Sequence, residues 1–78
     1  MTFNEASKEA LTQLQEILIS QTPYSEEYLS TFRTITSTLE MFYAESEFIE
    51  LLDTFGNRGE NVTRDIIDIV EHYKNRIP

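Results

Sequence analysis

YLSTFRTITSTLEMF, residues 28–42, carries the clearest periodic pattern in the chain. Alternating four- and three-residue steps separate its largest apolar side chains, which is the spacing of a seam between packed helices. The serines and threonines between them lower the helix propensity, so packing rather than intrinsic preference must hold this segment helical. We therefore predict a helix over about residues 25–43 whose buried seam consists of Tyr28, Phe32, Ile35, Leu39 and Phe42.

Toward the N-terminus, a second amphipathic pattern predicts a helix over about residues 4–21. Its apolar residues recur at three- and four-residue steps, and its charged residues fall largely off that face. Thr2 and Asn4 are candidate N-caps, and Pro23 should stop the helix because it disfavours a helical residue before it. The same proline suits the first turn of the next helix, with Thr22 or Ser25 as its cap. The predicted inner face of the first helix consists of Ala10, Leu11, Leu14, Ile17 and Leu18.

From residue 41 onward the apolar face moves to the opposite side of a helix. Two interpretations follow. Either the chain breaks near residues 44–46, with Ser46 capping a third helix over about residues 46–55, or one continuous helix over residues 25–55 carries two apolar faces. We favour the break. The pair Phe55-Gly56 is typical of a helix end, because glycine tolerates the left-handed conformation there. The displaced stripe consists of Met41, Phe48, Leu52 and Phe55.

The final segment predicts a helix over about residues 60–76, with Lys74 and Arg76 in its last turn, where positive charge suits the helix dipole. Together these segments predict an all-α fold: one domain, residues 1–78, built as a small antiparallel bundle of three to four helices. A chain of 78 residues has a thin core, so homodimerisation could complete the bundle. The apolar stripe of the last helix consists of Val62, Ile66, Ile69, Val70, Tyr73 and Ile77.

Charge and composition restrict the classes of function. The net charge of −8 at pH 7 repels phosphates and anionic lipids and favours basic partners. The chain has no cysteine, which excludes disulfides and thiolate metal sites. No apolar run approaches the roughly 20 residues of a membrane span, and the first residues lack the features of a signal peptide. We therefore expect a cytoplasmic protein that contacts neither membranes nor nucleic acid directly.

The acidic middle of the chain is the candidate partner-binding segment. Residues 40–53 contain five acids and no Lys or Arg, while residues 61–78 carry three charges of each sign. Acids without nearby cations repel one another along a helix, and a basic partner would relieve that repulsion. Exposed aromatic residues beside them would anchor an interface. The alternative is a solvated face with its aromatic residues, including Tyr24, Phe48 and Phe55, in the core. The predicted partner-binding residues are Glu40, Met41, Tyr43, Glu47, Glu50 and Asp53.

We expect no enzymatic activity, no cofactor and no metal. The one arrangement that could carry chemistry is Asp65, Asp68 and His72, the single histidine, at spacings of three and four on the last helix. Such a set could bind a divalent metal, or the histidine could act as a general base. Carboxylates near a histidine are common on helix surfaces, however, and three ligands on one helix rarely close a site. We favour a solvated face.

The acidic composition and the Ser25-Glu26-Glu27 helix start loosely resemble those of bacteriocin immunity proteins, which block a toxin by presenting acidic and aromatic residues. This resemblance covers composition and a three-residue cap and assigns no role to any residue. The sequence thus predicts a small protein-binding module, an inhibitor or regulator of the immunity-, antitoxin- or phage-inhibitor type, that engages a basic protein surface. The alternative is a homodimeric structural or regulatory protein, which a continuous helix exposing Met41, Phe48 and Phe55 would favour.

Overall fold

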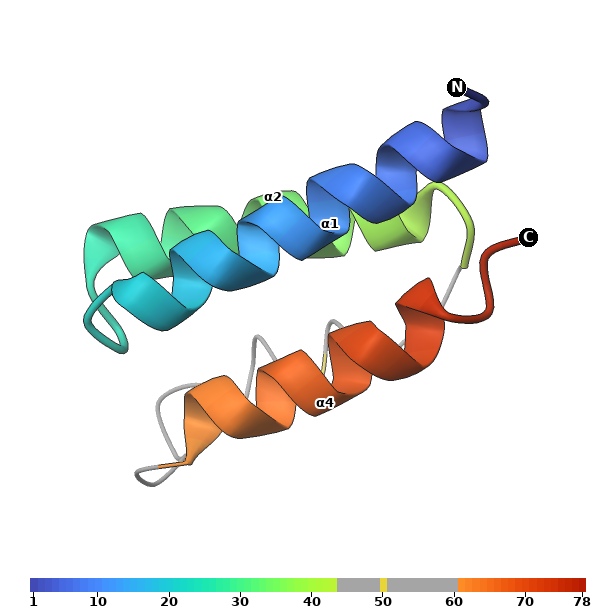
Figure 1. Ribbon diagram of the computed structural model, residues 1–78. Helices are drawn as coiled ribbons and strands as arrows, with labels where there is room; N and C mark the ends of the chain where they lie inside the picture. Colours follow the sequence, from blue (N-terminus) through green and yellow to red (C-terminus); the bar gives the residue numbers. More distant parts are fainter. Residues whose placement is uncertain (44–49, 51–60) are drawn as a thin grey trace.

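The computed structural model describes residues 1–43, 50 and 61–78. Its helices, labelled as in Figure 1, are α1 (Phe3–Ser20), α2 (Glu26–Glu40) and α4 (Val62–Lys74). Within these residues the fold is all-α, without strands, which confirms the predicted class. The predicted break near residues 44–46 and the predicted third helix lie outside the described residues, apart from Glu50, which is helical.

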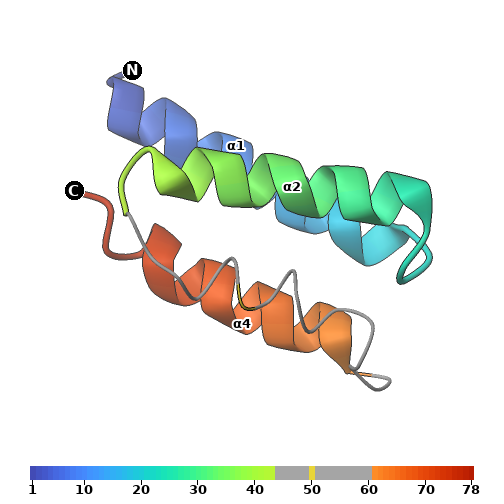
Figure 2. The ribbon, with the colours of Figure 1, turned by 180° about the vertical axis from the view of Figure 1, so that it is seen from behind.

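The three helices pack compactly, with α1 antiparallel to both α2 and α4. α1 and α2 run antiparallel and are joined by a short turn, and α4 lies against both of them while running antiparallel to α1 (Figures 1 and 2). As a result, the N-terminus of α1 and the C-terminal ends of α2 and α4 meet at one end of the bundle, and the α1–α2 turn lies at the other.

The core lies where the three helices meet. The seam of α2 is buried as predicted from Tyr28 to Leu39, and Phe42, just beyond the helix, is half-buried. The stripe of α4 is also confirmed, with Ile69 half-buried and the other members buried. Burying each large aliphatic or aromatic side chain contributes about 1.5–3 kcal/mol, so this seam is the main stabilising element. The core consists of Leu11, Leu18, Tyr28, Phe32, Ile35, Leu39, Val62, Ile66, Val70, Tyr73 and Ile77.

The inner face of α1 differs from the predicted one. Leu11 and Leu18 are fully buried and Leu14 is half-buried, but Ala10 is exposed and Ile17 is 46% exposed. Ser7 and Gln15 are buried instead. Because α1 contacts α2 on one side and α4 on the other, its buried face is centred on Leu11 and Leu18. Ile17 lies about 100° around the helix from Leu18 and falls outside both contacts.

Hydroxyl groups stabilise both helix starts in this hairpin. The Glu5 backbone N–H donates to the Thr2 side-chain oxygen at 3.1 Å, and the Tyr28 N–H donates to the Ser25 hydroxyl oxygen at 3.1 Å. These are N-caps, which satisfy donors that a helix otherwise leaves unpaired. The buried threonines Thr31 and Thr36 donate to backbone carbonyls one turn earlier. Such bonds let a threonine-rich helix bury hydroxyl groups without leaving them unpaired.

The α1–α2 turn differs from the predicted connection. The Ser25 N–H donates to the Thr22 carbonyl at 3.1 Å, so residues 22–25 form a β-turn that has Pro23 at its second position. Pro23 therefore precedes the helix rather than starting it, and Ser25 is the cap. Tyr24, at the third position, has φ of +67°. A proline followed by a positive φ is typical of a type II turn, in which glycine normally takes the third position.

We predict that the backbone of Tyr24 stores strain that glycine would relieve. Both Tyr24→Ala and Tyr24→Gly lose the ring contact with Tyr28, whose centroid lies at 6.4 Å, so the pair isolates the effect of the Cβ atom. A non-glycine residue costs about 1–2 kcal/mol in the left-handed region, which exceeds the cost of about 0.5–1 kcal/mol that the greater chain entropy of glycine in the unfolded state imposes. In urea denaturation the glycine variant should be the more stable by about 0.5–1 kcal/mol. An alanine variant of equal or greater stability would show that the turn is unstrained.

A partly buried hydrogen bond joins α2 to α4. The Tyr28 hydroxyl lies 2.9 Å from the Thr63 hydroxyl, and its ring is fully buried. Burial raises the pKa of Tyr28 above its ordinary value of 10.0, the Thr63 hydrogen bond lowers it, and Tyr24 nearby raises it. Because the folded pKa is raised, the contribution of neutral Tyr28 to stability is present below pH 10.0 and is lost as the pH rises above it.

A double-mutant cycle tests this bond. Tyr28→Phe and Thr63→Val should each lower the free energy of unfolding by about 1 kcal/mol, the usual net value of such a bond. The double variant should cost less than the sum of the two, because the bond can be lost only once. Strictly additive costs, measured by urea denaturation, would show that the two hydroxyls do not interact.

Candidate protein-binding surface

A row of aromatic rings crosses the end of the bundle where α1 begins and α2 and α4 finish. Ring centroids are separated by 5.9 Å between Phe3 and Phe42, 6.4 Å between Phe42 and Tyr43, and 5.1 Å between Tyr43 and Tyr73. His72 adds an edge contact to Tyr73 at 5.0 Å. These separations are those of favourable aromatic pairs. We call these five residues the aromatic row; it joins residues far apart in the chain into one continuous structure.

Tyr43 closes the C-terminal end of α4. Its hydroxyl donates at 3.2 Å to the carbonyl oxygen of Tyr73 in the last turn of α4, which also accepts the Arg76 backbone N–H at 3.1 Å. The guanidinium of Arg76 lies 5.9 Å from the ring centroids of both Tyr43 and Tyr73, within the range of cation–π attraction. The chain after α2 is thereby fixed against α4.

Large apolar side chains remain exposed around this row. Met1 is 86% exposed, Phe3 64% and Met41 58%, and these are three of the most exposed large hydrophobic residues in the described part of the chain. Phe42, half-buried, contacts Phe3 and directly follows Met41 in the chain. We call Met1, Phe3, Met41 and Phe42 the apolar end surface. Exposed apolar groups that are gathered in one place, rather than scattered singly, are typical of interaction sites.

The predicted partner-binding residues fall into three groups. Glu40 and Met41 are exposed at this end, and Glu50 is exposed as well. Tyr43 is half-buried, and its hydroxyl is hydrogen-bonded to Tyr73 of α4. Its main contacts are therefore with the rest of this chain. Glu47 and Asp53 lie outside the described residues, as do Phe48 and Phe55. Tyr24, 38% exposed, belongs to the α1–α2 turn at the opposite end and is not brought together with Met41.

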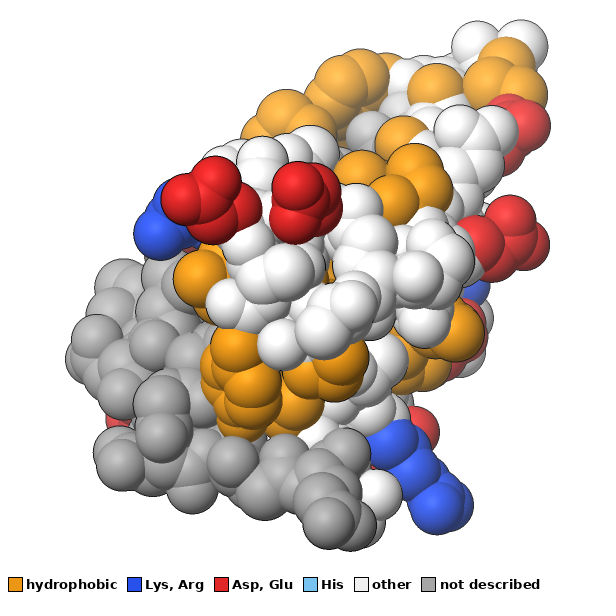
Figure 3. Space-filling view, turned by 90° about the vertical axis from the view of Figure 1, so that its left-hand side faces the viewer, with side chains coloured by type: hydrophobic (Ala, Val, Ile, Leu, Met, Phe, Trp, Pro, Cys, Tyr) orange, Lys and Arg blue, Asp and Glu red, His pale blue; other side chains and the backbone are white. Residues whose placement is uncertain are grey.

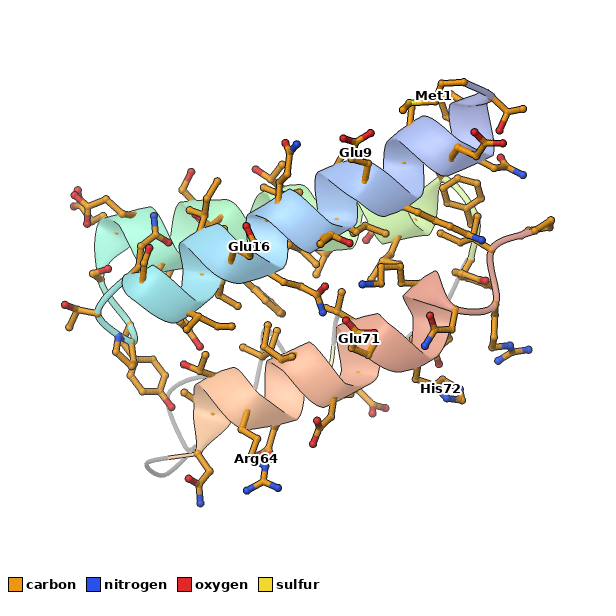
Figure 4. The ribbon with its side chains drawn as sticks, in the orientation of Figure 1. Met1, Glu9, Glu16, Arg64, Glu71 and His72 are labelled. Carbon is orange, nitrogen blue, oxygen red and sulfur yellow. The ribbon has the colours of Figure 1, made fainter. Side chains whose placement is uncertain are left out.

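The candidate trio Asp65, Asp68 and His72, for which we favoured a solvated face, forms no metal site among the described residues. Across residues 1–43, 50 and 61–78, no group of three or more His, Asp or Glu side chains is placed to hold a metal ion. Asp68 and His72 are exposed and Asp65 is half-buried. In Figure 4, His72 points away from α1, and its ring contacts Tyr73. The structure therefore gives this trio no metal-binding geometry.

A polar cluster that sequence reasoning missed joins α4 to α1. The Lys74 ammonium, on a side chain only 13% exposed, donates to Thr12 Oγ1 and Gln15 Oε1, both at 3.1 Å, and to Glu71 Oε1 at 2.8 Å. Figure 4 shows Glu71 on the side of α4 that faces α1. The three donors of the ammonium are thus all used. Partners separated by 59 and 62 residues leave no local signal in the sequence.

Glu71 is held ionised in this cluster. The Lys74 hydrogen bond lowers its pKa below the ordinary value of 4.5, partial desolvation raises it, and the Gln15 amide lowers it again. The Gln15 Nε2 atom is near enough to have this effect, but it makes no hydrogen bond of ordinary geometry within the described residues.

Sequence reasoning also missed Phe3, although its spacing to Ala6 and Ala10 was a usable signal.

Comparison with models of known protein families, with curated proteins and with solved structures gives no match. Among the described residues, no helix is both long enough and apolar enough to cross a membrane. The function must therefore be inferred from the chain's own surface.

The Glu71–Lys74 pair predicts a pH-dependent contribution to stability. Because the folded pKa is lowered, this contribution is present above pH 4.5 and is lost as the pH falls through the lowered value. Glu71→Gln should therefore be less stable than the wild type at neutral pH by about 0.5 kcal/mol, a small value because the pair is largely open to solvent on the Glu71 side. This difference in the free energy of unfolding should disappear at acidic pH when urea denaturation is repeated across the pH range.

Lys74→Gln provides the second arm of this experiment, because it removes the partner and retains the carboxylate. The difference between its free energy of unfolding and that of the wild type should become smaller as the pH falls over the same acidic range. Curves for wild type and Glu71→Gln that run parallel from neutral pH into acid would contradict the assigned role of the pair.

Proposed function

We propose that this protein is a non-catalytic protein-binding module that engages a basic segment of another protein through its apolar end surface. The observation that carries the proposal is the exposure of Met1, Phe3 and Met41 around the fixed aromatic row. Protein interfaces are enriched in methionine and aromatic residues, and a few such anchors supply most of the binding energy. Inhibition or regulation of the partner is the mode of action we propose, because binding alone achieves it.

Charge supports a basic partner. The chain carries a net charge of −8, and Glu40 lies exposed beside Met41, with Glu5 exposed near Phe3 in the sequence. Carboxylates around an apolar centre steer an oppositely charged partner and reject acidic ones. The same anchors would also serve a homodimer, but two copies would each bring the same negative charge to the contact. We therefore favour an outside partner over self-association.

The support for this surface is its rigidity as well as its composition. Phe42 is held from one side by Phe3 and from the other by Tyr43, which is itself bonded to α4. Anchors on a fixed scaffold lose little conformational freedom when a partner binds, which improves affinity. Arg76, exposed at the same end, packs over the two tyrosines and braces the row from the α4 side.

Affinity capture with matched variants tests the proposal. The wild-type chain is used as bait in an extract of its source, and each retained protein is quantified against baits carrying Met41→Asp or Glu40→Lys. Both changes should weaken retention of the specific partner by about tenfold or more, as expected for anchor and charge losses at an interface. Circular dichroism confirms that each bait remains helical.

The controls make the same chemical changes elsewhere. Ile19→Asp introduces a charge at an apolar residue that is 62% exposed near the other end of α1, and Glu27→Lys reverses an exposed charge at the start of α2. Neither should reduce retention. Equal retention by all five baits would refute the proposed surface, and a stable dimer in light scattering would favour self-association instead.

A further inference from the structure

α1 carries a second face that is exposed and mostly apolar. Phe3, Ala6, Ala10, Gln13 and Ile17 follow one another at steps of three, four, three and four residues, and all five are exposed. This is the spacing that the buried seam of α2 uses, and it keeps the five side chains on one side of the helix. We call these residues the outer stripe. It begins at the apolar end surface, since Phe3 belongs to both.

We propose that the outer stripe is the docking site for a basic amphipathic α-helix of the partner. This inference rests on the proposed function and specifies the kind of segment that is bound. Ala6 and Ala10 at the centre leave room for another helix to approach closely, because the distance between packed helices is set by the side chains at the contact. Phe3 and Ile17 provide large anchors at the two ends of the stripe.

The size of the stripe fits a helix. Phe3 and Ile17 are fourteen positions apart, which corresponds to about 21 Å along a helix at 1.5 Å per residue. A partner helix of about four turns covers that length. The stripe lies off the buried face of α1, which consists of Ser7, Leu11, Gln15 and Leu18, and at its first residue the ring of Phe3 also contacts Phe42.

The charges beside the stripe select a basic occupant. Glu5, Glu9 and Glu16 are exposed and lie along one edge of the stripe, at about 100° of rotation per residue. Figure 4 shows Glu9 and Glu16 on the exposed side of α1. Lys8, the one basic residue of α1, is half-buried and lies on another side of the helix. Lysines or arginines flanking the apolar seam of a partner helix would pair with these carboxylates, as flanking charges do in coiled coils.

The face is suited to this role and unsuited to a second copy of the chain. Figure 3, which looks at the molecule from the α1–α2 turn end, shows hydrophobic side chains among polar ones in its upper part and acidic side chains toward its left and right. If α1 packed against α1 of another copy, carboxylates would meet carboxylates, and like charges at close contact cost several kcal/mol. The charge pattern therefore distinguishes the two occupants.

Two synthetic peptides of about 18 residues test the inference, since about four turns are needed to span the stripe. Both have leucine at the seam positions of a heptad repeat; one has lysine at the flanking positions and the other has glutamate. Each is titrated into the isotopically labelled protein, and backbone amide shifts are followed by NMR. The lysine peptide should shift the amides of Ala6, Ala10 and Ile17, and the glutamate peptide should not.

A pair of variants separates docking from general charge attraction. Ala10→Lys places a bulky cation in the centre of the stripe, whereas Ser30→Lys places the same charge on the exposed side of α2. Ala10→Lys should weaken the lysine peptide by about tenfold or more, and Ser30→Lys should change its affinity by less than about twofold. Lysine is tolerated in exposed helix positions, so both variants should fold.

The outcomes are distinguishable. Shifts at the outer stripe that are lost in Ala10→Lys support the inference. Shifts confined to Glu40 and Met41 would overturn it while leaving the proposed binding surface intact. Equal weakening of peptide binding by both variants would also overturn the inference, as would no binding of the lysine peptide. The capture experiment with Met41→Asp would then test the proposed function independently.

Discussion

Burial of the α2 seam is the interaction on which the remainder of this small protein depends. α2 is rich in serine and threonine, residues with modest helix propensity, and it becomes stable because Tyr28, Phe32, Ile35 and Leu39 are almost completely removed from water. The threonine hydroxyls are satisfied by carbonyls of their own helix. A chain of 78 residues builds one thin core, and the buried residues of α1 and α4 pack together with this seam to form it.

Predictability follows the range over which each interaction acts. The seams of α2 and α4 could be predicted because helical periodicity is a local property of the sequence. The inner face of α1 was only half predictable: Leu11 and Leu18 lie inside, but Ile17 and Ala10 belong to a second apolar stripe. Burial of Gln15 depends on Lys74, 59 residues away, and nothing local to either residue signals it. The place of the α1–α2 turn and the Ser25 cap could be predicted, but the positive φ of Tyr24 could not, because its residue type gives no reason to expect it.

The candidate surface shows the same division. Exposure of Glu40 and Met41 could be anticipated from their positions off the main seam, and both are exposed. The spacing of Phe3 to Ala6 and Ala10 was a usable local signal, but its contact with Phe42, 39 residues away, left no such signal in the sequence. Tyr43 was predicted as a contact residue, and its hydroxyl instead bonds to the end of α4. The end of the bundle therefore combines a rigid aromatic interior with an apolar exterior, and the acidic helices around it provide long-range attraction for cations.

The polar cluster around Lys74 has a consequence for how the helices align. Apolar surfaces slide past one another at small cost, because one aliphatic contact is replaced by a similar one. An ammonium ion that is largely removed from water is different, since it is stable only where Thr12, Gln15 and Glu71 supply their oxygens. If α4 slipped by one turn along α1, the ammonium would lose the two acceptors on α1. The cluster thus fixes the register of α4 against α1. It thereby also fixes where Tyr73 and Arg76 lie relative to Tyr43.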